Sequence, residues 1–463
     1  MTQTISDDLE GLRAAMTGSV FAPDDDDYDQ ARSLFNGEFD RRPAVIARCS
    51  GPDDVAIALA FGRERGMEIT VRGGGHGTAG SAAKDGALMI DLSGLNGVTV
   101  DPAARRARAG GGATLADLDA ATQEHGLAVT GGKISNTGIG GLTLGGGMGW
   151  LTRKLGLTID NLVAAEVVTA DGQILRTSES EHPDLFWALR GGGGNFGVVT
   201  EFEYRLHEVG PLIQFGMFLV DLDQGVELLR LNRRLQPTLS TDLTILVSGV
   251  NAPPAPFVPT ELHFRPVYAV VVVGYGSAEQ HAEQMAQIRE AVPVLTEFAS
   301  PMPYVQLQRL LDDSAPWGAH CYEKAIYLDD LTDGAIAVVS EHLPRKASPL
   351  SLLHFYPLSG AYAEVGDDDT ALGGSRSARY GVFIVGLSTD PAALPAEREW
   401  VRTFWDALLP HSAGAAGYVN GLTDYADERV RAVYGPKYQR LAEIKATYDP
   451  TNVFRGNANI TPA

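Results

Sequence analysis

Clustered glycine is the feature that most constrains this chain. Glycine accounts for 53 of the 463 residues, well above the roughly 7% that is typical of globular proteins. The residues gather in the first 200 positions, at Gly73–Gly75, Gly110–Gly112, Gly138–Gly149 and Gly191–Gly194. Glycine permits positive φ angles and lets a ligand approach the peptide groups closely. The pattern favours a large ligand enclosed by backbone; turn glycines in a loop-rich domain are the alternative.

The spacing GxGxxG occurs twice, over Gly75–Gly80 and Gly192–Gly197. A Rossmann nucleotide site requires a strand, then the glycines, then a helix whose N-terminus faces the diphosphate. The first match is followed by a loop and a strand, and the second has a predicted helix before it and a strand after it. Neither context fits, so we do not expect a Rossmann site.

A second way to hold an anion is available in the segment Gly131–Gly141. Successive peptide N–H groups in glycine turns form anion-binding nests, and Asn136 and Thr137 would add side-chain donors. The sequence therefore allows a diphosphate cradle here. A glycine-rich packing crossover remains the alternative.

Charge argues against large polyanionic partners. The chain holds 37 Lys and Arg against 58 Asp and Glu, a formal net charge of −21. The densest basic cluster, Arg105, Arg106 and Arg108, stands alone. Without a basic stripe, neither nucleic acid nor an anionic membrane surface is an expected partner.

The apolar and cysteine content points to a protein of the cytoplasm. The longest apolar run, near Val267–Val273, is far shorter than the ~20 residues of a membrane helix. The first residues lack a basic and then apolar signal pattern. Only Cys49 and Cys321 occur, which fits a reducing compartment without a disulfide framework. No Cys/His spacing suggests zinc, and no metal site is expected.

The order of predicted elements indicates an α+β fold. Up to residue 206, short strands mix with single helices, without a repeating βαβ pattern. After Pro211 the strands lengthen, over 243–250, 267–275, 322–328, 351–356 and 380–387, with helices at about 224–236, 277–291, 331–343 and 391–409. This half predicts an antiparallel sheet covered by helices. One helix is expected over 427–445.

One histidine stands out among ten. His76 follows three glycines and precedes a fourth, which leaves its imidazole open to a flat ligand. Imidazole is a competent nucleophile. A surface histidine or one with its hydrogen bonds satisfied in the core is the alternative.

Several motifs, taken together and in order, carry a family resemblance. They are Arg72–His76, Thr137–Gly141, Gly145–Trp150, Asp160–Asn161, Asp184–Gly191, Asn195–Thr200 and Tyr448–Phe454. The chain resembles the FAD-linked oxidases of the berberine bridge enzyme and vanillyl-alcohol oxidase superfamily, most of all the bacterial 6-hydroxynicotine-oxidase-like branch. The likeness is strong over about 36–207 and 417–460 and weaker between them.

The resemblance implies a two-lobed PCMH-type FAD-binding domain and a substrate domain built on an antiparallel sheet. We expect the FAD-binding domain at 1–207, with its core at about 40–207, and the substrate domain at 208–415. Residues 416–463 would return to the FAD domain. His76 matches the histidine that bonds covalently to the flavin 8α-methyl. The family's second attachment site, a cysteine, aligns with Ile134, and Cys49 and Cys321 are expected to lie elsewhere, so a single 8α-histidyl bond is predicted.

The resemblance also implies a set of cofactor contacts. Glycine loops at 73–77 and 138–141 would hold the diphosphate, and Asn457 and Asn459 match C-terminal contacts, with a plain loop as the alternative. The expected FAD-binding residues are Arg72, Gly73, Gly74, Gly75, His76, Gly77, Gly132, Thr137, Gly138, Gly140, Gly141, Gly147, Val199, Tyr418, Asn420, Asn457 and Asn459.

The expected activity follows from the cofactor. Tyr418, in a Tyr-x-Asn motif, matches the family's catalytic base, and Tyr380 is a possible proton partner. His354 and Tyr356 share a strand face and are candidate substrate contacts, or else ordinary sheet residues. We expect an FAD-dependent oxidase that passes a hydride from a small organic molecule (a secondary metabolite, alcohol, sugar or amine) to flavin N5, with O2 giving H2O2.

Two other functions remain open at this stage. A flavin-dependent dehydrogenase or oxidative cyclase would react poorly with O2, and Ile139, before the glycine pair at 140–141, has an intermediate size that does not separate the two. A cofactor-free binding protein is the alternative from another class. The oligomeric state cannot be read from the sequence.

Overall fold

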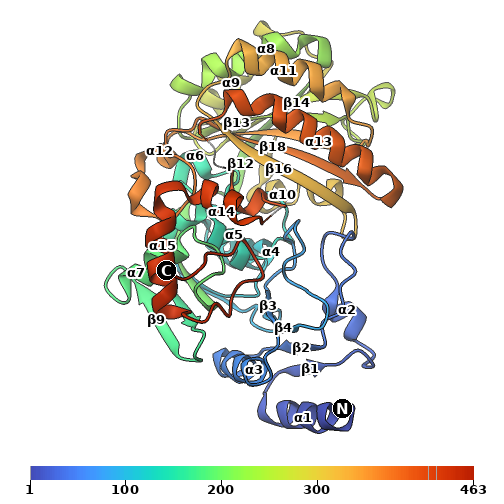
Figure 1. Ribbon diagram of the computed structural model, residues 1–463. Coiled ribbons are helices and arrows are strands. Elements are labelled where there is room, and N and C mark those ends of the chain that lie inside the picture. The colour runs from blue at the N-terminus through green and yellow to red at the C-terminus, as the bar shows by residue number, and fades with distance from the viewer. Residues whose placement is uncertain (1, 415–416, 424) are drawn as a thin grey trace.

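A computed structural model describes residues 2–414, 417–423 and 425–463. Figure 1 shows the N-terminal half below, a large sheet with its covering helices above, and the C-terminal segment alongside the lower half. Among the described residues no helix combines the length and the apolar character needed to cross a bilayer.

The first lobe is a four-stranded sheet in the order β1-β2-β4-β3. Its strands are β1 (Ser19–Phe21), β2 (Val45–Arg48), β3 (Ile69–Arg72) and β4 (Leu88–Asp91), with helices α1 (Thr2–Ala15), α2 (Tyr28–Arg32) and α3 (Pro52–Glu64). Strands β2 and β3 both run parallel to β4, and β1 is antiparallel to β2. The glycine loop that ends in His76 leaves β3 at the edge of this sheet.

The second lobe is an antiparallel sheet in the order β5-β6-β10-β8-β9. Its elements are β5 (Val98–Asp101), β6 (Arg106–Gly110), β8 (Leu162–Val168), β9 (Ile174–Ser178) and β10 (Val198–Arg205), with α4 (Leu115–Gln123), α5 (Ile139–Gly145) and α7 (Pro183–Leu189). The N-terminus of α4 is capped, because Thr114 and Asp117 form a capping box. The glycine-rich stretch at 139–145, which carries no helix prediction, forms α5.

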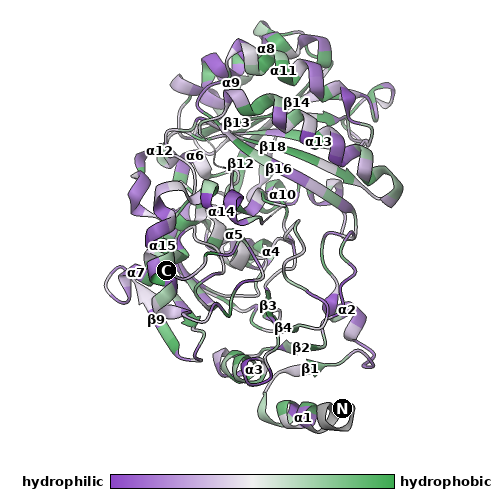
Figure 2. Ribbon diagram, in the orientation of Figure 1, coloured by the Kyte–Doolittle hydropathy of each residue, from purple (hydrophilic) through white to green (hydrophobic). Residues whose placement is uncertain are grey.

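The second half of the chain is built on a seven-stranded antiparallel sheet in the order β15-β12-β14-β13-β17-β18-β16. The strands are β12 (Leu212–Asp221), β13 (Leu243–Asn251), β14 (Pro266–Gly274), β15 (Thr296–Pro303), β16 (His320–Leu328), β17 (Leu352–Pro357) and β18 (Tyr380–Ser388). Helices α8 (Gly225–Leu235), α9 (Ala278–Ala291), α11 (Asp333–His342) and α13 (Leu394–Leu408) cover one face. In Figure 2 strand β18 is largely green while α13 alternates in colour, as a helix with one buried side does. The α+β class and the helix-covered antiparallel sheet are confirmed.

The C-terminal segment packs onto the second lobe. It holds α14 (Asp427–Tyr434) and α15 (Tyr438–Tyr448) in place of the single predicted helix, because Gly435, with φ +51°, and Pro436 interrupt the helical ladder. The fully buried Lys445 ammonium donates to Asp449 and to the carbonyls of Asn195 and Phe454, each at 2.8 Å. These bonds tie the last residues to the glycine loop before β10.

Five short elements complete the description. They are α6 (Thr152–Leu155), α10 (Tyr304–Gln308), α12 (Ala361–Glu364), β7 (Leu127–Ala128) and β11 (His207–Glu208). The proposed domain division at residue 207 stays a prediction, and the one between 415 and 416 lies outside the described residues.

Candidate active site

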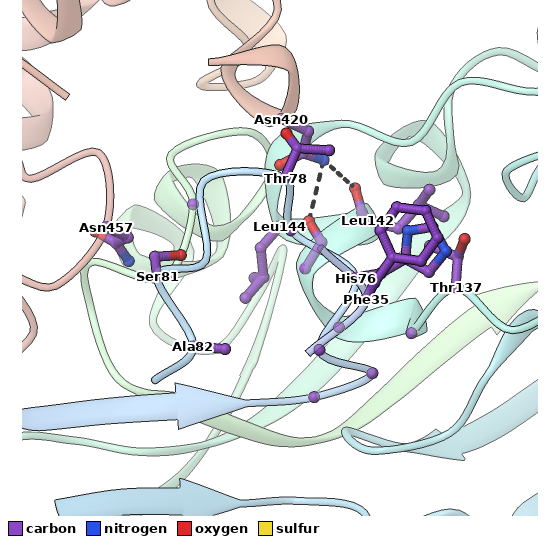
Figure 3. A pocket seen from close by; sticks show the side chains of 18 of the residues that line it. Phe35, His76, Thr78, Ser81, Ala82, Thr137, Leu142, Leu144, Asn420 and Asn457 are labelled. Atoms are coloured by element: carbon purple, nitrogen blue, oxygen red, sulfur yellow. Dashed lines mark hydrogen bonds between the residues drawn. The ribbon is translucent and has the colours of Figure 1, made fainter. Parts of the chain in front are cut away.

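A large cavity lies where the two lobes, the uncovered face of the seven-stranded sheet and the C-terminal segment meet. Its volume is about 440 Å³, within the range of small-molecule sites. Its wall is formed by the glycine loops at 73–77 and 137–141, the segment 193–199, strands β16, β17 and β18, and residues 418–422 and 454–458. Segments far apart in sequence therefore share one ligand space. Figure 3 shows Asn457 and Ser81 at one end of it and His76 and Phe35 at the other.

Two glycine loops cross with their backbones in contact. A Cβ atom on Gly138 would lie 2.3 Å from the Gly74 nitrogen, and one on Gly74 would lie 2.4 Å from the Gly138 nitrogen. Gly75 also has φ +67°, a left-handed conformation that favours glycine. The crossing therefore requires glycine in both loops. It also leaves peptide groups facing the cavity, and such groups suit a diphosphate.

The imidazole of His76 is held on two sides. Its ring stacks on Phe35 with centroids 3.9 Å apart and planes 13° apart, as Figure 3 shows. Its Nε2 lies 3.0 Å from Oδ1 of Asn136. Burial lowers the pKa of His76 to about 4. The ring is therefore neutral near pH 7, and Asn136 engages Nε2 rather than Nδ1.

Tyr418 and Asn420 form a compact polar unit over α5. The Tyr418 hydroxyl oxygen accepts from the Gly147 N–H at 2.7 Å and from Nδ2 of Asn420 at 3.2 Å. Asn420 also donates to the carbonyls of Gly141 and Leu142, the contacts drawn in Figure 3. Burial raises the pKa of Tyr418 to about 12, although both donors favour the phenolate.

The seven-stranded sheet contributes a second group of polar side chains. His354 and Tyr356 line the cavity from β17, and Nδ1 of His354 lies 2.5 Å from the Ser248 hydroxyl. Glu323 enters from β16 and accepts from the Thr78 hydroxyl at 2.9 Å. Burial raises the pKa of this carboxyl to about 7. The cavity thus contains a carboxyl group that titrates near neutrality.

Most of the expected site residues are brought together. The cavity wall includes Gly73, Gly74, Gly75, His76, Gly77, Gly132, Thr137, Gly138, Gly140, Gly141, Val199, Tyr418, Asn420 and Asn457, together with His354 and Tyr356. Three expected contacts lie just behind it. The Arg72 guanidinium pairs with Asp91 at 3.2 Å, Gly147 acts through its hydrogen bond to Tyr418, and Asn459 follows Ala458 of the wall.

Two expectations are corrected by the geometry. Tyr380 lies on the helix-covered face of β18, packed in the core with Val382 and Ile384, whereas Phe383 and Val385 face the cavity. It therefore has no access to a substrate there. Cys321, which we expected to lie elsewhere, lines the cavity from β16. Burial raises the pKa of its thiol well above the usual value, so it is held as an unreactive thiol.

Four residues of the site escaped the sequence argument: Phe35, Lys133, Asn136 as a partner of His76, and Glu323. Phe35 and Glu323 come from the N-terminal loop and from an edge strand, and no local motif marks either. Lys133 and Asn136 lie in the glycine segment at 131–141. The sequence therefore places both residues near the expected ligand, but it does not show which side chains they contact.

The residues present fit an FAD. The crossing glycine loops supply peptide donors for a diphosphate, and His76 stands at one end of the cavity. At the other end the side-chain oxygens of Asn457 and Asn459 are buried and, among the described residues, lack a hydrogen-bond partner. Acceptors of this kind suit hydroxyl or amino groups of a nucleotide. Across the described ranges, no cluster of three His, Cys, Asp or Glu side chains is arranged to hold a metal ion.

Comparison with known proteins supports this assignment. The family model "FAD binding domain" matches residues 43–178, and the model "Berberine and berberine like" matches 417–461. The (R)-6-hydroxynicotine oxidase of Paenarthrobacter nicotinovorans is 31% identical over 468 residues, which cover 97% of each chain.

Solved structures agree in fold. The structure of 6-hydroxy-D-nicotine oxidase from Arthrobacter nicotinovorans superposes with a TM-score of 0.84 at 29% identity, covering 97% of this chain and 98% of that one. A glucooligosaccharide oxidase from Acremonium strictum, which carries a 6-S-cysteinyl, 8α-N1-histidyl FAD, reaches 0.86 at 25% identity over 98% and 99% of the chains. The resemblance seen in the motifs is confirmed. The chain belongs to the berberine bridge enzyme-like family of FAD-linked oxidoreductases, in the 6-hydroxynicotine-oxidase-like branch, and is an FAD-dependent oxidoreductase.

Proposed function

We propose that this protein is an oxidase that removes a hydride from a small organic molecule and delivers the electrons to O2, giving H2O2. The observation that carries the proposal is the cavity in which the glycine loops and His76 face polar side chains of the seven-stranded sheet. When bound there, FAD supplies a two-electron acceptor that dioxygen can reoxidise. The relatives named as nicotine and glucooligosaccharide oxidases support this choice.

We further propose a single covalent bond between the flavin and His76. With Nε2–H donating to Asn136, the lone pair of the neutral ring resides on Nδ1, which makes that nitrogen the nucleophile. The position of the family's cysteine is occupied by Ile134, which also lines the cavity. The remaining thiol on the wall, Cys321, is kept protonated by its burial. One bond, through histidine, is the expected attachment.

Tyr418 is the proposed acceptor of the substrate proton. The two donors aimed at its oxygen stabilise the phenolate that proton uptake consumes, and they hold the ring in place. The pKa of about 12 means that the phenol is protonated near neutral pH, and an ionised Glu323 raises that pKa further. Glu323 faces the same cavity and titrates near pH 7, so its carboxylate is the second candidate for the acceptor of the substrate proton.

Two measurements test the proposal. After acid precipitation the yellow flavin should stay with the wild-type protein and should wash out of the His76→Ala variant. His125→Ala, at an exposed site, is the matched control and should retain it. Free flavin in the wild-type supernatant would refute the covalent bond.

Reaction of the reduced protein with O2 decides between the two candidate activities. Rapid reoxidation with one H2O2 per flavin supports the oxidase, and slow reoxidation would show a dehydrogenase or an oxidative cyclase. A panel of alcohols, sugars and amines screened for peroxide would identify the substrate class. The cytoplasmic location expected from the cysteine content stays a prediction.

A further inference from the structure

Lys133 presents an ammonium group that no protein acceptor satisfies. It lies in the glycine segment before Ile134, lines the cavity, and is only 5% exposed. Its Nζ packs 3.6 Å from the centre of the Tyr356 ring and 5.2 Å from that of Trp150. In the described part of the chain Nζ has no hydrogen-bond partner. The contacts of the ammonium are with the faces of these two aromatic rings.

The neighbouring groups do not neutralise it. His354 has Nδ1 occupied by the Ser248 hydroxyl, and Tyr356 presents a ring face, so neither supplies a negative charge. The acidic group that faces the same cavity, Glu323, is bonded to Thr78. Over the residues described, the buried Lys133 ammonium has no carboxylate within hydrogen-bond distance.

A buried ammonium without an acceptor is costly, since burial disfavours the charge and each missing hydrogen bond adds to the penalty. Burial lowers the pKa of Lys133 well below its usual value, because the charged form loses its hydration. Methionine would fill most of this space with an unbranched apolar chain one atom shorter, without such a penalty. The ammonium is therefore explained by a ligand that completes its hydrogen bonds rather than by packing.

We propose that Lys133, together with His354 and Tyr356, forms a subsite for a carboxylate group of the substrate. The Lys133 ammonium comes from the first half of the chain, and the His354 and Tyr356 rings come from the seven-stranded sheet. A carboxylate bound there would therefore contact both halves of the protein. The inference rests on the proposed function, which it narrows to the oxidation of small organic acids. Tyr356 and His354 shape the slot, and Lys133 supplies the charge.

The test compares a carboxylate with a neutral molecule of the same shape. Sodium benzoate and benzamide are titrated into the holoprotein by calorimetry, which reports a Kd whether or not the flavin responds. A hydrogen bond to a charged partner predicts that benzoate binds about 10- to 100-fold more tightly than benzamide. Lys133→Met should abolish this preference and Lys133→Arg should retain much of it. Lys84→Met, at a half-exposed lysine paired with Glu68, is the matched control and should change neither Kd.

The outcomes separate the inference from the function on which it rests. Equal affinities for benzoate and benzamide in the wild type, or an unchanged preference in Lys133→Met, would overturn the subsite. If Lys133→Met is insoluble, Lys133→Gln provides the same comparison. A purified protein without flavin absorbance that still prefers benzoate through Lys133 would refute the oxidase and leave the anion site supported.

Discussion

Substitution of Gly138 by alanine probes the crossing of the two glycine loops. The new Cβ would lie 2.3 Å from the Gly74 nitrogen and 2.6 Å from its Cα. Ordinary contact begins near 3.4 Å, so the loops must separate by about 1 Å. The obstructing atoms are backbone, which cannot rotate aside as a side chain does. Overpacking of this kind costs about 1–3 kcal/mol.

That cost should appear in cofactor binding. If both loops contact FAD only at their native spacing, a penalty of about 2 kcal/mol weakens the binding of FAD roughly 30-fold. The assay is the FAD content of the purified variant and the Kd of added FAD in a His76→Ala background, where no covalent bond holds the cofactor.

A matched control is Gly51→Ala, whose Cβ would meet nothing within 4 Å and whose φ of −164° suits any residue. It should bind FAD as the parent does. Unchanged FAD affinity in Gly138→Ala would show that the crossing does not form part of the cofactor site, and an equal loss in Gly51→Ala would show that the assay reports general instability.

Three further predictions follow from individual contacts. Asn136→Ala should slow covalent flavin attachment about 2- to 10-fold, the effect of one hydrogen bond, in a time course of acid-stable flavin; an unaltered rate would exclude the tautomer argument. Activity should rise with pH through about 7 as the Glu323 carboxyl ionises, and Glu323→Gln should remove that inflection from the pH profile of kcat, whereas its persistence would place the titration elsewhere. Asp160→Asn leaves the Arg376 guanidinium, 5% exposed and paired at 2.7 Å, without its charge partner, so the variant should be about 3–5 kcal/mol less stable in a denaturant titration; near wild-type stability would contradict that burial cost.

Elements with strong local patterns were predictable from the sequence. Helix α3, from Pro52 to Glu64, is such an element, since proline at the start and acids in the first turn mark its beginning. Strand β15 was missed because its prolines and exposed side chains lack strand character. Strand β12 carries no prediction, because the change of composition at Pro211 resembles a boundary between domains and the apolar run directly follows it.

The site was predictable only where neighbouring residues in the sequence form a motif. The glycines around His76 and the Tyr-x-Asn motif at Tyr418 are such cases. Tyr380 could not be placed, because a shift of one position along a strand moves a side chain to the other face and the sequence does not say which face is covered. The Lys133 subsite depends on rings that β17 brings to it from more than 200 positions away. Such partners follow from tertiary packing alone.

The anchoring of the C-terminal segment through Lys445 has a consequence for biosynthesis. The wall near Asn457 is supplied by residues that are translated long after the glycine loops sharing the same cavity. The pocket therefore remains incomplete on the ribosome until that late stretch emerges from the exit tunnel. Cofactor loading must then follow release of these residues, and nascent chains stalled before Phe454 should stay colourless.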